Sequence, residues 1–192
     1  MSARWTVVVP VRPAGKTRLV VPGIDRVELA RAIALDTIEA ASRVAEVRIV
    51  TSDPSLALPG TTLVREPEPR GIAEAVRRGL IGVTGHRAVL LGDLPGLDPA
   101  DLAEALRLAE AQQLSAVADA ESTGTTLVAA TPGHDLVPSF GDGSWHRHVA
   151  EGFTPLHVPV GSTVRRDVDL AEHLAGPLGP RTSAVLSRCL TP

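Results

Sequence analysis

Short apolar, β-rich runs alternate with stretches of helical periodicity through the first half of the chain. The runs predict strands, because a strand that is covered on both faces is apolar along its whole length. Apolar residues at helical spacing and helix-starting residues predict the helices. The predicted strands are 5–11, 46–51, 61–65 and 88–91, and the predicted helices are 25–43, 72–80 and one that begins after Asp98. This alternation favours an α/β fold with a mostly parallel sheet, since parallel strands need long crossover connections.

The stretch 88–102 combines the end of a predicted strand with the start of a predicted helix. Its apolar run ends at Gly92-Asp93, and a proline and a second glycine then break the regular backbone. Asp98 is expected to cap the following helix, with Asp101 three residues later in an arrangement like a capping box. Ligands of open α/β sheets bind outside the carboxyl ends of the strands, so Asp93 is the first candidate functional residue.

The pattern changes from Leu114 onward. Two β-rich runs, 115–120 and 126–130, flank a polar connector with a glycine and predict a hairpin. A weakly periodic stretch follows, then an expected strand at 154–160 and expected helices that begin near Leu170 and at Pro180. The second half is therefore expected to add a small β-meander that closes the site, within a single domain that spans 1–192.

Composition narrows the possible functions. The 192 residues include 44% hydrophobic and 21% charged residues, which is ordinary for a folded protein with its own core. Two Phe, two Trp and no Tyr offer few rings for base stacking, and the net charge of −3 comes with no long basic run, so nucleic-acid binding is not expected. Cys189 is the only cysteine, which excludes an internal disulfide and a multi-cysteine zinc site. No apolar run approaches the ~20 residues of a membrane span and no signal peptide is visible, so a cytoplasmic protein with no membrane partner is expected.

Three cations, Arg12, Lys16 and Arg18, share a glycine-containing loop directly after the first predicted strand. Such a loop in an α/β protein is a common place to hold a phosphate, and from these residues alone a solvated basic loop is an equal alternative. The two-glycine spacing of a Walker A loop is absent.

Asp167 and Asp169 are two residues apart, which places both carboxylates on one face if the segment is extended. With Asp93 they would give three hard oxygen ligands, a set that suits Mg²⁺ bound partly through substrate phosphates. The alternative is that Asp169 caps the following helix while Asp167 pairs with Arg165 or Arg166. The prediction of a metal site depends on the combination with Asp93.

Two further patches, Ser122–Thr126 and Phe140–Ser144, combine hydroxyl groups with glycine. Each could bring a backbone N–H close to an anion, or could be a plain turn. Arg147 and His148, which follow the second patch, are interpreted as anion contacts, and a metal site at His146 and His148 is the other interpretation. Neither the hydrolase Gly-x-Ser-x-Gly elbow nor the Gly-x-Gly-x-x-Gly dinucleotide motif occurs.

These patches form an ordered set along nearly the whole chain. The set is Val9-Pro-Val11, Lys16-Thr-Arg-Leu19, Leu91-Gly-Asp-Leu-Pro95, Thr123-Gly-Thr-Thr126, Phe140-Gly141 with Ser144 and Arg147-His148, Arg166-Asp-Val-Asp169, and Gly179-Pro-Arg-Thr182. It resembles the 2-phospho-L-lactate or phosphoenolpyruvate guanylyltransferases of deazaflavin coenzyme (F-420) biosynthesis. The resemblance implies a GT-A-like, Rossmann-like nucleotidyltransferase fold with helices on both faces of the central sheet.

The resemblance also implies a reaction, in which the phosphate of a three-carbon acid attacks the α-phosphorus of GTP and releases pyrophosphate. A later transferase of the same pathway then uses the product. The implied roles are metal binding by Asp93, Asp167 and Asp169, triphosphate binding and catalysis by Lys16 and Arg18, further nucleotide contacts at Gly71 and Gly92, and acceptor binding at Thr125, Gly141, Ser144, Arg147 and His148. The chain departs from the family pattern at Gly71-Ile72-Ala73, where the family usually has Gly-Leu-Asn.

Several alternatives stay open on the sequence alone. Phosphoenolpyruvate, 2-phospholactate and 3-phosphoglycerate differ by a double bond or a hydroxyl, so the sequence does not choose among these acceptors. A nucleotidyltransferase acting on molybdopterin or a sugar phosphate, and a non-catalytic nucleotide-binding protein, are the rival functions. A homodimer is expected only from the general frequency of such assemblies.

Overall fold

The computed structural model describes residues 4–12 and 19–188, so Lys16, Arg18 and Cys189 lie outside the described residues. The strands are β1 (Trp5–Pro10), β2 (Glu46–Thr51), β3 (Thr62–Arg65), β4 (His86–Leu90), β5 (Leu114–Ala118), β6 (Thr125–Ala130) and β7 (Thr154–Pro155). The α-helices are α1 (Arg26–Ser42), α2 (Ile72–Leu80), α3 (Pro99–Ala109), α4 (Ser144–Ala150) and α5 (Pro180–Ser187). Short 3₁₀ helices occupy Pro54–Leu56, Thr163–Arg165 and Ala171–Ala175. Within these ranges, no helix has the length and apolar character needed to cross a membrane.

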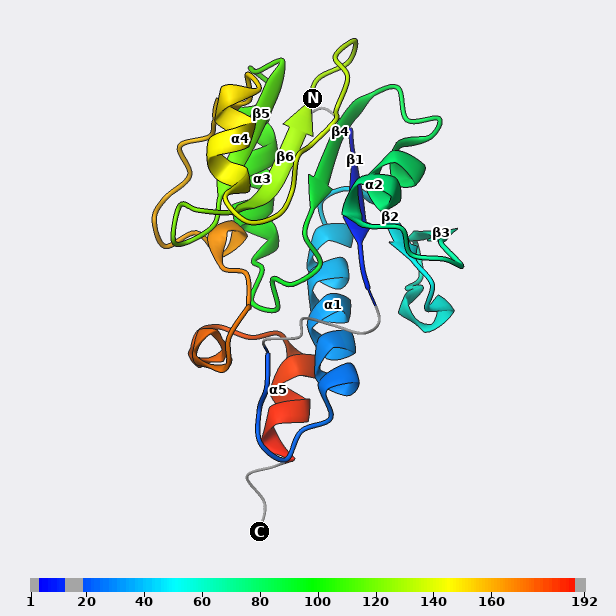
Figure 1. Ribbon diagram of the computed structural model, residues 1–192, viewed down its shortest axis with the longest axis vertical. Coiled ribbons are helices and arrows are strands. Elements are labelled where there is room, and N and C mark those ends of the chain that lie inside the picture. Colours follow the sequence, from blue (N-terminus) through cyan, green and yellow to red (C-terminus); the bar gives the residue numbers. More distant parts are fainter. Residues whose placement is uncertain (1–3, 13–18, 189–192) are drawn as a thin grey trace.

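The described strands form one sheet in the order β3-β2-β1-β4-β6-β5-β7 (Figure 1). β3, β2, β1 and β4 run parallel, as the alternation of strands and helices predicts. β6 joins β4 in the antiparallel sense, with Leu90 opposite Leu127, and β5 pairs antiparallel with β6. The carboxyl end of β4 therefore lies beside the amino end of β6.

Helices cover both faces of the sheet (Figure 1). On one face α1 and α3 pack over a cluster that includes Val7 and Val9 of β1. On the other face α2 packs over Val8, and Trp145 of α4 contacts the same cluster. All three valines are fully buried, which explains why the first predicted strand is apolar at successive positions rather than alternating.

The second half of the chain differs from expectation in three places. Of the expected strand 154–160, only β7 enters the sheet, beside β5, and Pro159 further along has no N–H for a ladder. The weakly periodic stretch contains α4, which was not predicted; it has seven residues and follows Gly143 without a side-chain cap. The helix expected near Leu170 is a 3₁₀ helix. The predicted hairpin of β5 and β6 is confirmed, and it extends the central sheet beyond β4.

α5 lies beside α1 (Figure 1) and docks there through a buried carboxylate. Asp36 of α1, only 5% exposed, accepts the backbone N–H groups of Arg181 at 3.1 Å and Thr182 at 2.8 Å, at the start of α5. A Cβ on Gly179 would lie 2.3 Å from the carboxyl carbon of Asp36, so only glycine allows this approach. The motif 179–182 thus fixes α5 against the helix that supports the site.

Candidate active site

The turn that carries Asp93 follows β4 and is fixed by its neighbours. Gly92 approaches β1 so closely that a Cβ there would lie 2.9 Å from a methyl carbon of Val11. The hydroxyl of Thr37, on the buried face of α1, accepts the N–H of Leu94 at 3.0 Å. Asp93 is therefore held at a defined place between the sheet and α1.

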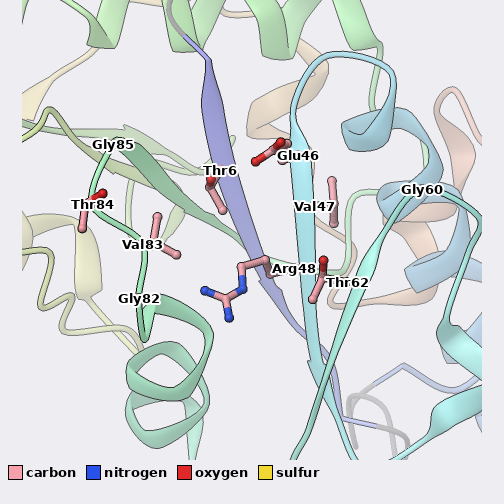
Figure 2. A pocket seen from close by; sticks show the side chains of 10 residues that line it. All are labelled: Thr6, Glu46, Val47, Arg48, Gly60, Thr62, Gly82, Val83, Thr84 and Gly85. Atoms are coloured by element: carbon pink, nitrogen blue, oxygen red, sulfur yellow. The ribbon is translucent and has the colours of Figure 1, made fainter.

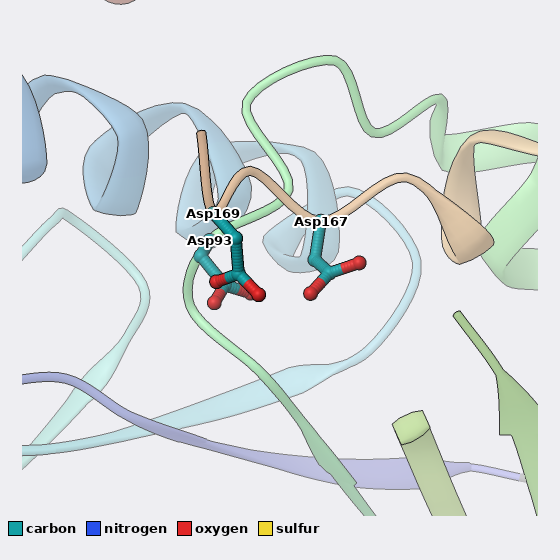
Figure 3. Close-up of side chains that lie close together, drawn as sticks. All are labelled: Asp93, Asp167 and Asp169. Atoms are coloured by element: carbon teal, nitrogen blue, oxygen red, sulfur yellow. The ribbon is translucent and has the colours of Figure 1, made fainter. Parts of the chain in front are cut away.

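Asp167 and Asp169 reach Asp93 from a distant part of the chain. Val168 donates its N–H to the carbonyl oxygen of Asp93 at 2.9 Å, and its buried side chain packs in a cluster with Leu29 of α1. Because side chains alternate along extended backbone, the two flanking carboxylates turn the other way, toward Asp93 (Figure 3). One carboxylate oxygen from each aspartate lies within 4.8 Å of the other two. The predicted cluster of three carboxylates is present.

This donor set fits a divalent cation. All three aspartates are partly buried, and three carboxylates at this spacing repel one another unless positive charge is near. Oxygen-only donors suit hard cations such as Mg²⁺ and Mn²⁺ rather than softer ions that select thiolate or imidazole.

Thr163 anchors the segment that leads to Asp167. The carboxylate of Asp101 in α3 accepts hydrogen bonds from the N–H and from the hydroxyl of Thr163, each at 2.7 Å. The hydroxyl oxygen of Thr163 accepts in turn the N–H of Asp98 at 2.8 Å. The expected capping box therefore runs through Thr163 instead of joining Asp98 and Asp101 directly. Partial burial acts to raise the pKa of Asp101, but the hydrogen bonds from Thr163 hold it below its usual value. Asp98 caps α3 as predicted, through the N–H of Ala100 at 2.8 Å.

Arg165 provides a second anchor for the same segment. Its guanidinium donates to the carbonyl oxygen of Asp119 at 2.7 Å and to the hydroxyl of Ser122 at 3.1 Å, in the connection between β5 and β6. The alternative in which Asp169 caps a helix is wrong, because the 3₁₀ helix begins after Leu170 without a side-chain cap.

The two patches of glycine and hydroxyl groups lie next to each other at the end of β4. Thr125 begins β6, and the carbonyl oxygen of its neighbour Thr126 accepts the N–H of Leu91 at 2.9 Å, one residue before Gly92. The carbonyl oxygen of Thr123 accepts the N–H of Trp145 in α4 at 3.2 Å. The first patch is therefore joined both to the strand end that carries Asp93 and to the helix that follows the second patch.

α4 changes the interpretation of the two histidines. Residues two apart on a helix point in different directions, and His146 is exposed whereas His148 is fully buried. The interpretation as a two-histidine metal site is therefore wrong. Nδ1 of His148 lies 2.9 Å from Oγ1 of Thr125, and Nε2 accepts the N–H of Ser139 at 2.9 Å, so both ring nitrogens are engaged within the protein.

Arg147 also contacts the protein's own backbone. Its guanidinium donates to the carbonyl oxygen of Ser139 at 3.2 Å and to that of Asp142 at 2.6 Å. Arg147 and His148 therefore both hold the loop 139–142. Because His148 is fully buried and both of its ring nitrogens are engaged, its interpretation as a direct anion contact is wrong, whereas Arg147 is exposed and its role as an anion contact stays a prediction.

Comparison with known proteins decides the family. Residues 5–155 match the family model described as "Guanylyl transferase CofC like". The chain belongs to this family. A protein named phosphoenolpyruvate guanylyltransferase from Streptomyces scabiei (strain 87.22) is 40% identical over 213 residues, an alignment that covers 98% of this chain and 99% of the relative. The chain is accordingly an enzyme of the nucleotidyltransferase class.

Solved structures confirm the fold of this CofC-like chain. A nucleotidyl transferase from Methanothermobacter thermautotroptrophicus (Mth528) has a TM-score of 0.59 at 16% identity, covering 96% of this chain and 99% of its own. Rv0371c from Mycobacterium tuberculosis, in a complex with manganese, has a TM-score of 0.60 at 22% identity, covering 91% of this chain and 97% of its own. The expected nucleotidyltransferase fold, with a mostly parallel sheet covered on both faces, is confirmed.

Gly71, which the family resemblance assigns to the nucleotide, lies on the β1 side of Asp93. Gly71 precedes α2, and a Cβ on it would lie 3.7 Å from the guanidinium of Arg12, just after β1. Lys16 and Arg18 follow in the part of the loop that lies outside the described residues. Arg12 and the start of α2 therefore share the carboxyl edge of the sheet with Asp93.

A hollow of about 430 Å³ lies at the other end of the sheet, near the amino ends of β1 and β2 (Figure 2). Thr6, Arg48 and the loop 82–85 line it. The guanidinium of Arg48 already donates to the carbonyl oxygen of Ile81 at 2.7 Å. The three aspartates follow the carboxyl end of β4, so this hollow is separate from the candidate active site.

Proposed function

We propose that this CofC-like enzyme transfers GMP from GTP to phosphoenolpyruvate and releases pyrophosphate, a step of deazaflavin coenzyme F-420 biosynthesis. The name of the Streptomyces scabiei relative supports the choice of acceptor, since the alignment spans almost all of both chains. The observation in the structure that carries the proposal is the group of three carboxylates within 4.8 Å at the end of β4. Such a group is what a phosphate-transferring enzyme needs to hold a divalent cation.

The reaction needs no strong general base, because the phosphate of the acceptor is already an anionic nucleophile at neutral pH. The protein has to supply position, an in-line approach to the α-phosphorus and compensation of phosphate charge. Asp93, Asp167 and Asp169 would hold Mg²⁺, which when bound neutralises and orients phosphate oxygens. The anchors at Thr37, Thr163 and Val168 keep the three carboxylates in place before any substrate arrives.

The order of the strands suggests how the two substrates approach each other. Asp93 follows β4, which has β1 on one side and β6 on the other. We assign the triphosphate to the β1 side, where Gly71 and Gly92 permit close backbone approach. Lys16 and Arg18, which follow Arg12 in the sequence but lie outside the described residues, would supply positive charge. We assign the acceptor to the β6 side, where Thr125, Gly141 and Ser144 lie. The two substrates would then meet at Asp93.

The test is pyrophosphate release with GTP in the presence of Mg²⁺ or Mn²⁺, with phosphoenolpyruvate, 2-phospho-L-lactate and 3-phosphoglycerate supplied separately and products identified by mass. We expect a guanylylated product with phosphoenolpyruvate. Asp93→Asn should lower turnover by roughly 100-fold or more, because it weakens charge compensation at the reacting phosphates. Asp135→Asn is the matched control, since Asp135 is exposed and lies outside the site.

The outcomes separate the rival functions. Product with only 2-phospholactate or 3-phosphoglycerate would keep the reaction and replace the acceptor. Product with ATP, CTP or UTP in place of GTP would show that Ala73, where the family usually has Asn, has changed the base preference. Nucleotide binding that ignores divalent cations, together with no turnover on any acceptor, would refute the proposal in favour of a non-catalytic role.

A further inference from the structure

His148 is the most fully engaged polar side chain near the proposed acceptor site. It is 0% exposed, with one ring nitrogen 2.9 Å from Oγ1 of Thr125 and the other 2.9 Å from the backbone nitrogen of Ser139. The rings of Phe140 and Phe153 pack edge-on against the imidazole, with centroids 5.4 and 5.0 Å away. The ring therefore has one orientation, and it joins β6 to the loop after Pro138.

These two contacts determine where the imidazole proton lies. The backbone nitrogen of Ser139 can only donate, so Nε2 must present its lone pair and carry no proton. A neutral imidazole then carries its proton on Nδ1 and donates it to Oγ1 of Thr125. Burial lowers the pKa of His148, which keeps the ring neutral near pH 7.

This tautomer of His148 determines the direction in which the Thr125 hydroxyl can donate. The Thr125 oxygen already accepts a hydrogen bond from His148 Nδ1–H, so the hydroxyl O–H is left to donate a hydrogen bond in another direction. The anionic group of the phosphorylated acid can accept this hydrogen bond. A threonine hydroxyl otherwise rotates and can equally well accept, which would oppose an anion.

We propose that His148 is a positioning residue for the acceptor: it holds the Thr125 hydroxyl as a one-way donor toward the anionic group of the phosphorylated acid. This inference rests on the proposed function, because it assumes that Thr125 faces the acceptor. His148 touches no substrate itself. Through Ser139 it also holds the loop that carries Gly141, and the Ser139 carbonyl is fixed in turn by Arg147.

Two substitutions of His148 distinguish the roles of its two ring nitrogens. The amide of Asn occupies roughly the place of Nδ1, so His148→Asn keeps a donor for Thr125 and loses the contact with Ser139. The amide of Gln reaches the place of Nε2, so His148→Gln keeps an acceptor for Ser139 and loses the donor to Thr125. We expect His148→Gln to raise the KM for the acceptor by about 10-fold with the KM for GTP unchanged, as one lost hydrogen bond to an anion implies. His148→Asn should recover most of that loss.

A second variant tests whether the effect passes through Thr125. In a Thr125→Val background the hydroxyl is gone, so His148→Gln should add little to the acceptor KM, in contrast to its effect in the native background. Equal effects of the Asn and Gln variants, or additive effects with Thr125→Val, would overturn the proposal and leave His148 a packing residue.

The protonation state gives a readout that does not depend on activity. Long-range ¹H–¹⁵N correlation spectra of the whole protein should show His148 as the Nδ1–H tautomer at neutral pH. An Nε2–H tautomer would overturn the positioning role even in an active enzyme. The expected tautomer in a protein that turns over no phospho-acid would instead show that the proposed function, rather than the geometry at His148, is at fault.

Discussion

The three-aspartate cluster predicts that a divalent cation stabilises the folded protein by a measurable amount. Carboxylate oxygens lie within 4.8 Å of one another, a distance at which two unit charges repel by roughly 0.9 kcal/mol in bulk water and roughly 3.5 kcal/mol at an effective dielectric constant of about 20. The side chains are partly buried, so each of the three pairs lies between these limits. A bound cation offsets this repulsion in the folded state, whereas in the unfolded chain Asp93 separates from the other two aspartates.

The size of the stabilisation follows from binding linkage. A cation present at about 100 times its dissociation constant stabilises the folded state by about 2.7 kcal/mol. For a chain of this length, each kcal/mol shifts the melting temperature by roughly 2–4 °C, so the expected shift is roughly 5–11 °C. Asp167→Asn removes one of the three charges and takes part in two of the three pairs. We expect it to keep less than half of the shift at the same cation concentration.

The assay is thermal unfolding of the cation-free protein, followed by titration with MgCl₂ and with MnCl₂ at constant ionic strength. Asp135→Asn removes the same chemical group from an exposed position and should keep the full shift, which controls for general salt effects. A melting temperature that ignores both cations would refute the argument, because no cation would then be held by the folded protein. An equal shift in Asp167→Asn would place the cation elsewhere.

Three further predictions concern buried polar side chains. Glu66 is 3% exposed and, among the residues that the structure describes, its Oε1 has no hydrogen-bond partner. Glu66→Gln should therefore stabilise the fold by about 1–3 kcal/mol in urea unfolding, and a lower midpoint would contradict this reasoning. Asp36→Ala leaves two N–H groups of α5 without an acceptor and should cost about 2 kcal/mol, whereas an unchanged midpoint would mean that α5 stays docked without this contact. Burial lowers the pKa of His148 below 6.5; the charge of Glu151 opposes this shift and the charge of Arg147 adds to it. The neutral form of His148 therefore stabilises the fold above that pH, and this contribution is lost as the pH falls. The unfolding free energy of His148→Gln should therefore fall less between pH 7.5 and about 5 than that of the native chain, and parallel curves would contradict this reasoning.

The first half of the fold was predictable because local and global signals agree there. The central strand β1 is covered by helices on both faces, so its sequence is apolar at successive positions. Aspartates cap the starts of α1 and α3, and for Asp98 this was expected. α4 gave no such signal, since it follows a glycine without a side-chain cap. The strand expected at 154–160 is short because it leaves the sheet after Pro155, and Pro159 cannot donate to a ladder, although the surrounding residues favour β structure.

The metal-binding cluster was predictable for a different reason. An Asp-x-Asp pair on extended backbone shares one face whatever the tertiary structure, and the end of a central strand is a general location for ligands. What the sequence could not show is how the pieces are held together. Thr163 is shared between Asp98 and Asp101 across more than sixty residues, and no local pattern marks it. Thr37 could have been noticed in the sequence, because its hydroxyl lies among the apolar residues of the predicted helix 25–43.

His148 shows why the acceptor side was harder to interpret. Charged and titratable residues beside a glycine-hydroxyl patch have the composition of an anion site, and composition alone cannot tell a residue that meets the ligand from one that holds the loop. The difference arises from α4, which buries His148 against Thr125 and Ser139 while leaving His146 exposed. A buried imidazole with both nitrogens engaged has a fixed proton position, and a fixed proton position determines the direction of the next hydrogen bond. His148, which the sequence suggests as a substrate contact, can therefore act on the substrate only through Thr125.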